Sequence, residues 1–307
     1  MSLLVVGTVA FDAIETPFGK TDKIVGGAAT YIGLSASKFT DKTNLVSVVG
    51  DDFLKSAIDM MHAHQMDTEG LQIKEGEKTF FWSGKYHNDM NTRDTLDTQL
   101  NVLETFDPKV PASYQDCECL MLGNLMPAIQ QQVLDQLQER PKLIVLDTMN
   151  FWMDNCLDDL MKALKNVDVL TINDEEARQL SGEYSLMKAA RKILSFGPKY
   201  LIIKKGEHGA LLFNNEEVFF APALPLEEVF DPTGAGDTFA GGFVGHLCAT
   251  KDYSFENMKR AVIIGSAMAS FCVEKFGTER IANLSDEAVN NRIQEFVNLV
   301  QFDIELK

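Results

Sequence analysis

Residues 231–238 read Asp-Pro-Thr-Gly-Ala-Gly-Asp-Thr and run directly into the apolar, glycine-containing stretch 239–248. Small residues followed by such a stretch predict a tight turn that opens a helix, with unobstructed N–H groups from Gly234, Ala235 and Gly236. A helix N-terminus of this kind binds anions, because its free N–H groups and the helix dipole carry partial positive charge. We therefore predict that this turn holds a phosphoryl group that gains negative charge during transfer.

Asp237 falls in the first turn of the same predicted helix, beside the anion site. A carboxylate there is placed to accept the proton of an attacking hydroxyl, as a general base does in phosphoryl transfer. The alternative is an aspartate that only caps the helix. Capping alone does not account for two glycines, an alanine and a second acid in one turn, so we favour the catalytic interpretation.

The rest of the chain alternates short, apolar runs with segments of helical periodicity. Runs rich in Val, Ile and Leu predict strands that are buried on both faces. Their alternation with helices predicts an α/β fold with three layers and a central, mostly parallel sheet. The strand runs are 3–9, 45–49, 120–122, 143–146, 167–172 and 200–203, and the helical segments include 53–64, 129–137, 157–164 and 186–194.

Two segments interrupt this alternation, at about 13–25 and 71–95. Residues 78–86 look strand-like, so we expect the two segments to form a small antiparallel sheet beside the main one. Such a sheet could act as a lid, because closure over a substrate excludes water from a transferable phosphoryl group. An ordinary edge hairpin is the alternative. We treat 1–307 as one domain that carries this lid subdomain.

Composition argues against several kinds of partner. The 307 residues include 28 Lys and Arg against 45 Asp and Glu, a formal net charge of −17 that repels nucleic acid and anionic membranes. The five cysteines lack the paired spacing of a zinc site or a disulfide framework, which predicts reduced thiols and a cytoplasmic location. The longest nearly apolar stretch, 261–273, is too short to span a bilayer. We expect a small-molecule substrate.

The turn from Asp231 to Asp237 resembles the C-terminal signature of the ribokinase-like, or PfkB, family of carbohydrate kinases, in which an Asp, Thr, Gly, Ala, Gly, Asp run opens a helix. The resemblance covers the whole chain in order. It implies a ribokinase-like fold and transfer of the γ-phosphoryl group of ATP to a hydroxyl of a sugar or sugar-like substrate, with Mg²⁺ as cofactor. Asp231 and Thr233 match the positions at which family members often hold a monovalent cation such as K⁺.

On the substrate side, Asp12 is similar to the family's sugar-binding aspartate and would accept hydrogen bonds from substrate hydroxyls. Gly26 and Gly27 resemble its di-glycine motif, although the pair alone fits any close-packed helix start. The family usually follows this motif with an Asn that binds a sugar hydroxyl, where this chain has Tyr31. The bulk of the phenol favours a smaller, flatter or differently hydroxylated substrate than ribose, on which Trp82 of the expected lid could stack.

On the nucleotide side, Asn173 and Glu176 match the family's Asn-x-x-Glu motif, which helps to position Mg²⁺ and phosphate largely through water. Their spacing fits a helix capping box equally well. Lys204, Gly206 and Gly209 lie in a stretch that resembles the family's Gly-x-x-Gly turn beside the nucleotide. The lysine could touch ATP phosphates, against the alternative of a solvated surface charge.

Other functions remain as alternatives. A nucleoside kinase of the same family would hold its substrate between aromatic side chains, which Phe80, Trp82 and Tyr31 could supply. A non-catalytic sugar or nucleotide sensor would have lost the base or the anion site, whereas this chain keeps both. A dehydrogenase is disfavoured, because the residues after Gly7 do not form a Gly-x-Gly-x-x-Gly fingerprint. The lid could also join two subunits of a homodimer.

Overall fold

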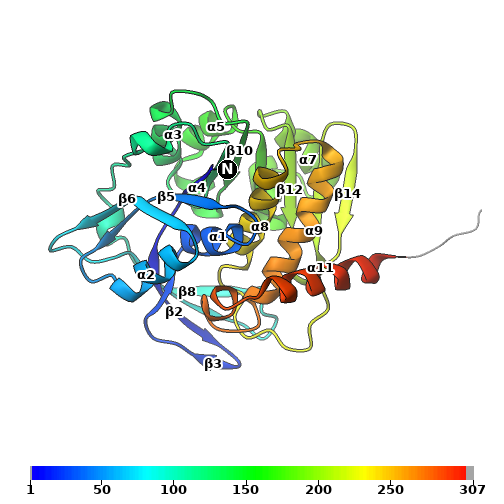
Figure 1. Cartoon of the computed structure of the whole chain (residues 1–307). Coiled ribbons are helices and arrows are strands. Elements are labelled where there is room, and N and C mark those ends of the chain that lie inside the picture. Colours follow the sequence, from blue (N-terminus) through cyan, green and yellow to red (C-terminus); the bar gives the residue numbers. More distant parts are fainter. Residues whose placement is uncertain (1, 302–307) are drawn as a thin grey trace, which may run out of the picture.

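The computed structural model describes residues 2–301, which contain a nine-stranded sheet and a smaller sheet beside it (Figure 1). The strands of the large sheet are β1 (Ser2–Val6), β5 (Lys42–Gly50), β6 (Met66–Lys74), β9 (Cys119–Leu122), β10 (Leu143–Asp147), β11 (Val169–Asn173), β12 (Tyr200–Lys204), β13 (Ala210–Phe213) and β14 (Val218–Ala221). Their order is β14-β13-β12-β11-β10-β9-β1-β5-β6. All neighbours from β12 to β6 pair in parallel, and β13 and β14 add an antiparallel edge, which confirms the mostly parallel sheet.

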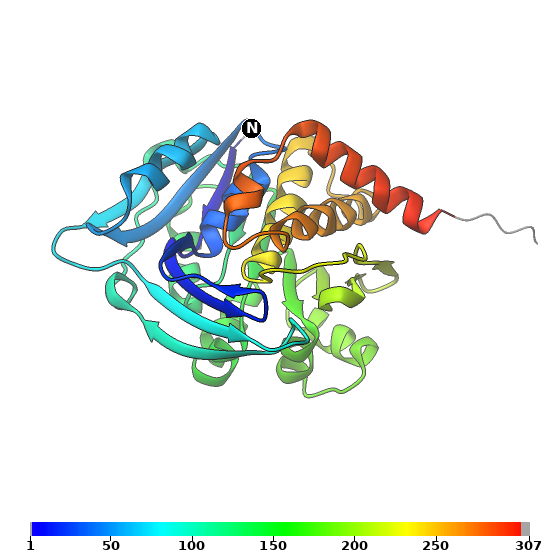
Figure 2. The same cartoon turned by 90° about the horizontal axis from the view of Figure 1, so that it is seen from below.

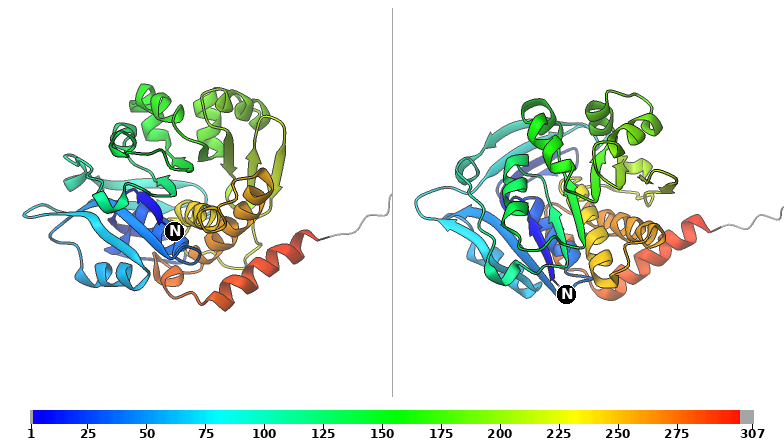
Figure 3. Two further views of the ribbon diagram at one scale, coloured as in Figure 1. Left: turned by 45° about the horizontal axis from the view of Figure 1, so that its top comes forward. Right: turned by 90° about the horizontal axis from the view of Figure 1, so that it is seen from above.

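Helices cover both faces of the large sheet, which confirms the three-layer prediction (Figure 3). β1 shows the reason, because Leu3 and Val5 enter the core on one face while Leu4 and Val6 enter the core on the other. The first face carries α1 (Ala28–Ala36), α2 (Lys55–Ala63), α8 (Ala235–Thr250), α9 (Phe255–Cys272), α10 (Glu279–Ala282) and α11 (Asp286–Val300). The second face carries α3 (Pro127–Gln136), α4 (Asn150–Asn155), α5 (Leu157–Leu164), α6 (Asp174–Ser181) and α7 (Leu186–Leu194). Short 3₁₀ turns occupy Asn101–Leu103, Ala112–Tyr114 and Gly206–His208.

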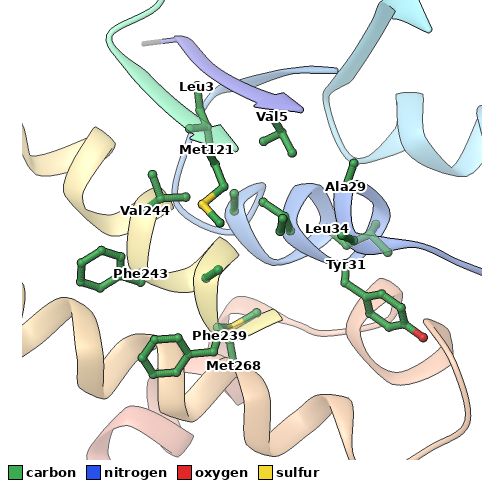
Figure 4. Close-up of a cluster of buried hydrophobic side chains, with 14 of the residues drawn as sticks. Leu3, Val5, Ala29, Tyr31, Leu34, Met121, Phe239, Phe243, Val244 and Met268 are labelled. Carbon is green, nitrogen blue, oxygen red and sulfur yellow. The ribbon is translucent and has the colours of Figure 1, made fainter. Parts of the chain in front are cut away.

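The helix that follows the Gly-Ala-Gly-Asp turn, α8, packs tightly against α1 in the first core (Figure 4). Glycines permit this approach, since a Cβ added at Gly241 would lie 2.3 Å from the carbonyl oxygen of Ile32. A Cβ at Gly245 would lie 3.0 Å from the Cα of Ala36. The backbones of the two helices are therefore held close together, which fixes the position of the turn that precedes α8. In the described part of the chain, no helix has the length and hydropathy needed to cross a membrane.

The small sheet forms a separate layer beside the large one (Figure 2). Its strands are β2 (Ala10–Thr16), β3 (Gly19–Lys20), β4 (Ile24–Gly26), β7 (Phe81–Tyr86) and β8 (Arg93–Gln99). β2 pairs antiparallel with β3 and β4, and β7 pairs antiparallel with β8, as expected, whereas β2 and β7 run parallel. We refer to this sheet as the lid.

The expected lid segments, 13–25 and 71–95, overlap these strands with different bounds. Residues 71–74 belong to β6 of the large sheet, and β8 continues to Gln99. β6 is an edge strand of the large sheet, so its mixture of buried and exposed residues resembles that of a lid strand.

The carboxyl ends of the parallel strands meet at one edge of the large sheet, where open α/β sheets bind ligands. Asp147, Asn173 and Lys204 are the last residues of the neighbouring strands β10, β11 and β12. The topology thus brings three polar side chains from separate parts of the chain to the same edge.

Candidate active site

The Gly-Ala-Gly-Asp turn has the predicted form. Gly234 is the N-cap of α8 and has φ 76°, a conformation that favours glycine. The Ala235 N–H is not free, because it donates to the Pro232 carbonyl oxygen at 3.2 Å. Within residues 2–301, the N–H groups of Gly236 and Asp237 donate to no backbone acceptor. Anion binding at this turn stays a prediction, for which the amides of Gly236 and Asp237 are available, whereas the Ala235 N–H closes the turn.

Lys204 lies against this turn from the end of β12. A Cβ added at Gly236 would be 3.1 Å from Lys204 Nζ. The same Nζ forms an ion pair with Asp147 Oδ2 at 3.2 Å, and only 18% and 8% of the two side chains are exposed. Burial by itself lowers the pKa of Lys204, but attraction by Asp147, Glu176 and Asp237 outweighs burial and raises it. The side chain is thus a buried cation beside the anion site, and the solvated-surface alternative does not hold.

Asn173 and Glu176 form a capping box at the start of α6. The Glu176 N–H donates to Asn173 Oδ1 at 2.8 Å, and the Asn173 N–H donates to Glu176 Oε2 at 2.7 Å. Burial, followed by repulsion from Asp147, raises the pKa of Glu176 to about 7. The capping interpretation is therefore correct, and the same bonds fix a buried carboxyl close to the Asp147–Lys204 ion pair.

Asp237 is partly buried in the first turn of α8, close to this group of charges. Burial, followed by repulsion from Asp147, raises the pKa of Asp237 to about 7, against the opposing positive charges of Lys204 and Arg93. A carboxyl with such a pKa exchanges its proton near neutral pH, as a general base must. The arrangement is suited to proton abstraction next to a phosphate site.

Asp12 lies in the middle of β2 and is 5% exposed. A Cβ added at Gly26 would be 1.9 Å from Asp12 Oδ2, so only glycine leaves room for this carboxyl. Gly27 has φ 91°, and its backbone amide favours the charged form of Asp12 and so lowers the pKa of that carboxyl. Burial, followed by repulsion from Asp231, raises the pKa of Asp12 to about 7. The di-glycine motif thus creates the space and a donor for the acid on the substrate side.

Tyr31 lies beneath the turn that begins α8. Its side chain is 1% exposed, and its ring lies under the turn, 2.5 Å from where a Cβ at Gly234 would be. Figure 4 shows its hydroxyl pointing away from the apolar side chains of the cluster. Among the described residues this hydroxyl has no hydrogen-bond partner. Tyr31 thus supports the turn from below, and its contact with substrate stays a prediction.

Trp82 lies on the inner face of the lid. It pairs across the sheet with Asp12, and paired residues project from the same face. A Cβ added at Gly84 would be 2.1 Å from the indole, so the ring lies over this glycine. The Trp82 Nε1–H donates to Thr95 Oγ1 at 3.4 Å. The lid thus presents an aromatic surface beside the buried carboxyl of Asp12.

Two contacts hold the lid against the large sheet. The Thr233 hydroxyl donates to the Tyr86 hydroxyl at 3.2 Å. On the other side, Asn91 Oδ1 is 2.4 Å from where a Cβ at Gly206 would be. The lid therefore touches both the loop before α8 and the turn after β12.

Asp231, together with Gly206 and Gly209 in the turn after β12, shapes the loops around the site. Asp231 is fully buried, and its carboxylate accepts the N–H groups of Thr233 and Gly277, each at 2.9 Å. Gly206 has φ 54° and Gly209 has φ 81°, and a Cβ at Gly209 would be 2.1 Å from a carbonyl oxygen of β14. These residues brace the loops, while a bound cation at Asp231 and nucleotide contact at the glycines stay predictions.

Three residues of the site were missed by the sequence analysis, namely Asp147, Tyr86 and Arg93. Asp147 had a usable signal, because it directly follows the apolar run 143–146 and therefore ends a buried strand. Tyr86 and Arg93 gave none, because their approach to α8 depends on the register of the lid strands.

An α/β sheet whose strand ends meet a glycine-rich helix start and a group of buried charges, with a small sheet beside them, is typical of a small-molecule kinase. The model of the pfkB family carbohydrate kinases matches residues 2–284, so this chain belongs to that family and is an ATP-dependent kinase. It is 30% identical over 250 residues to a cytidine kinase of Thermococcus kodakarensis, and the matched region covers 80% of this chain and 87% of that protein.

Solved structures show the same fold. A Methanocaldococcus jannaschii nucleoside kinase of the ribokinase family matches with a TM-score of 0.76 and 21% identity, covering 96% of this chain and 98% of that one. A putative ribokinase II from E. coli, in complex with ATP and Mg²⁺, matches with a TM-score of 0.76 and 19% identity, covering 96% and 99%.

Proposed function

We propose that this protein transfers the γ-phosphoryl group of ATP to a hydroxyl of a nucleoside. The observation that carries the proposal is the position of Trp82, whose indole lies over Gly84 on the same face of the lid as Asp12. A ribose hydroxyl can donate to the carboxylate while a base stacks on the indole, and such stacking contributes about 1–3 kcal/mol per base. The similarity to a cytidine kinase supports the same substrate class.

In the proposed reaction, Asp237 accepts the proton of the acceptor hydroxyl. The hydroxyl oxygen forms a bond to the γ-phosphorus of ATP, the bond from that phosphorus to the β–γ bridging oxygen breaks, and ADP leaves. The N–H groups of the turn and the Lys204 ammonium face the charge that develops on the transferred group. Asp147 holds the ammonium in this position.

The acidic residues at this edge of the sheet suit a divalent cation. Burial raises the pKa values of Asp147, Glu176 and Asp237, and repulsion from Asp147 adds to the shifts of the other two, so the three carboxyls lie close together and a bound cation would favour their charged forms. Within residues 2–301, no three acidic, His or Cys side chains form a ready metal site, which fits binding through water. Glu176 and Asp147 would hold Mg²⁺ in this way, and bound Mg²⁺ neutralises the phosphates of ATP.

Three further expectations stay predictions. A K⁺ requirement, with the ion near Asp231 and Thr233, is tested by comparing turnover in K⁺, in Na⁺ and without either. Homodimerisation through the lid is supported by β8, an edge strand that is exposed along its length and carries Leu96 with 56% of its surface exposed. Sedimentation velocity tests this expectation. The cytoplasmic location rests on the cysteine pattern alone.

The test is ADP formation with Mg²⁺ and K⁺ across cytidine, uridine, adenosine, inosine and free ribose. We expect a nucleoside to be the best acceptor, and Trp82→Leu to raise its KM at least tenfold while Trp82→Phe, which keeps a ring, changes it less. The Asp237→Asn protein serves as the inactive control. Ribose as the best acceptor, with no effect of Trp82→Leu, would replace the nucleoside by a free sugar. ATP binding without turnover on any acceptor would favour the sensor.

A further inference from the structure

Arg93, the first residue of β8, lies on the inner face of the lid. It is paired across the antiparallel β7–β8 ladder with Tyr86, and such partners project from the same face. The Tyr86 hydroxyl reaches Thr233 in the loop before α8. The side chain of Arg93 therefore projects toward the active site.

The turn that precedes Arg93 is well braced. Asp89 Oδ1 accepts the N–H groups of Asn91 at 3.1 Å and Thr92 at 2.9 Å, and the His87 N–H donates to the Thr92 carbonyl oxygen at 2.9 Å. Asn91 also approaches Gly206 in the turn after β12. Because the chain just before Arg93 is anchored at Tyr86 and at Asn91, the backbone of Arg93 has a defined position next to the site.

The surroundings of Arg93 are acidic. Its positive charge opposes the upward shifts in the pKa values of Asp237 and Glu176, so the guanidinium lies near both carboxyls. The other charged groups around Asp237 are Asp147 and Lys204. Within residues 2–301, Arg93 itself forms no ion pair and no hydrogen bond through its side chain.

Lys85, the lid residue before Tyr86, differs in this respect. It projects from the opposite face of the sheet, where its Nζ pairs with Glu15 Oε1 at 2.6 Å. Lys85 is thus committed to the outer face, whereas Arg93 offers an unpaired planar donor toward the phosphate site. Guanidinium groups bind phosphate oxygens with two parallel N–H bonds.

We propose that Arg93 is a catalytic residue of the lid, which binds the γ-phosphoryl group of ATP and stabilises its charge while it moves to the acceptor. The proposal rests on the phosphotransfer proposed above. The acceptor proton still goes to Asp237, and the leaving group is still ADP. Arg93 adds its positive charge, from the lid, to that of the Gly236 amide and Lys204, and it gives up no proton. The lid thereby contributes to the chemistry as well as to the exclusion of water.

Binding measurements test this assignment without any knowledge of the acceptor. The probes are MgADP and the Mg²⁺ complex of the β,γ-imido analogue of ATP, each titrated calorimetrically into the wild type, Arg93→Gln and Lys85→Gln. We expect Arg93→Gln to weaken the triphosphate analogue about tenfold or more and MgADP less than twofold, because only the former carries the γ-phosphate. Lys85→Gln, which also removes one lid charge, should leave both affinities unchanged. Equal weakening of both nucleotides, or of neither, would overturn the proposal.

Turnover gives a second measurement, with the best acceptor of the panel as probe. Arg93→Gln should lower kcat by roughly 100-fold while changing the KM of the acceptor less than threefold. Loss of the positive charge should also move the acidic limb of the kcat/KM profile to higher pH, a shift that a purely structural role would not produce. An unchanged kcat would sink the catalytic role. If the wild type phosphorylates no acceptor, the proposed function fails while the two affinities still decide the role of Arg93.

Discussion

Replacement of Asp237 by Asn should make the ligand-free protein more stable and nearly inactive. The unfolded chain releases the proton of this carboxyl near pH 3.8, whereas the folded protein holds it until about pH 7. Stability is therefore lost as the pH rises from about 4 to about 7 and stays lost above that range. The difference between the two pKa values corresponds to a loss of about 4 kcal/mol in the free energy of unfolding, and partial exposure of the side chain reduces this loss to about 2 kcal/mol. The neutral amide of Asn avoids this cost.

The assay is thermal unfolding followed by circular dichroism at pH 5.5 and pH 8, without Mg²⁺ or nucleotide. A gain of about 2 kcal/mol raises the melting temperature by roughly 4 °C in a chain of this size, and at pH 5.5 the gain should be roughly half as large. Asp59→Asn, which removes an exposed carboxylate on α2, is the matched control and should show no pH-dependent gain. Turnover of Asp237→Asn should fall roughly 100-fold or more, as loss of a general base predicts.

Two results would refute this reasoning. A variant that is less stable than the wild type at pH 8 would show that the carboxylate of Asp237 is favourably solvated or paired in the folded protein. An equal gain at both pH values would show that the stabilisation comes from packing and owes nothing to the charge. Either outcome would also remove the electrostatic reason for assigning Asp237 a pKa suited to a base.

Two further substitutions probe the lid and the anion turn. Gly84→Ala should raise the KM of a nucleoside about tenfold with little change in kcat, because the new Cβ would lie 2.1 Å from the present position of the Trp82 ring and would push the ring aside. Steady-state kinetics checks this prediction. An unchanged KM would exclude the indole as the surface on which the base stacks. Tyr31→Phe should stabilise the ligand-free protein by about 1 kcal/mol, because the buried hydroxyl has no hydrogen-bond partner within residues 2–301. A clear loss of stability in thermal unfolding would indicate that it has one.

Much of the architecture could be predicted because it depends on local sequence. The apolar runs around Leu3–Val6 and Leu143–Leu146 are buried on both faces, as a strand in the middle of a parallel sheet must be. The run from Gly234 to Asp237 forms its turn within one segment, so its conformation follows from glycine geometry and helix termini alone. Edge elements were less certain, because β6 borders the large sheet and has a less regular burial pattern.

Local sequence therefore predicts the sheet with its covering helices, the glycine-rich turn that opens α8 and the acid in the first turn of that helix. Only the tertiary structure decided how side chains far apart in the chain meet. Asp147 and Lys204 are 57 residues apart, and they pair because β10 and β12 end at the same edge on either side of β11. Tyr31 is buried because α1 and α8 pack through glycines, and Arg93 shares a face of the lid with Tyr86 because of the register of β7 and β8. Such contacts depend on strand order and helix packing, which a local pattern of residue types does not encode.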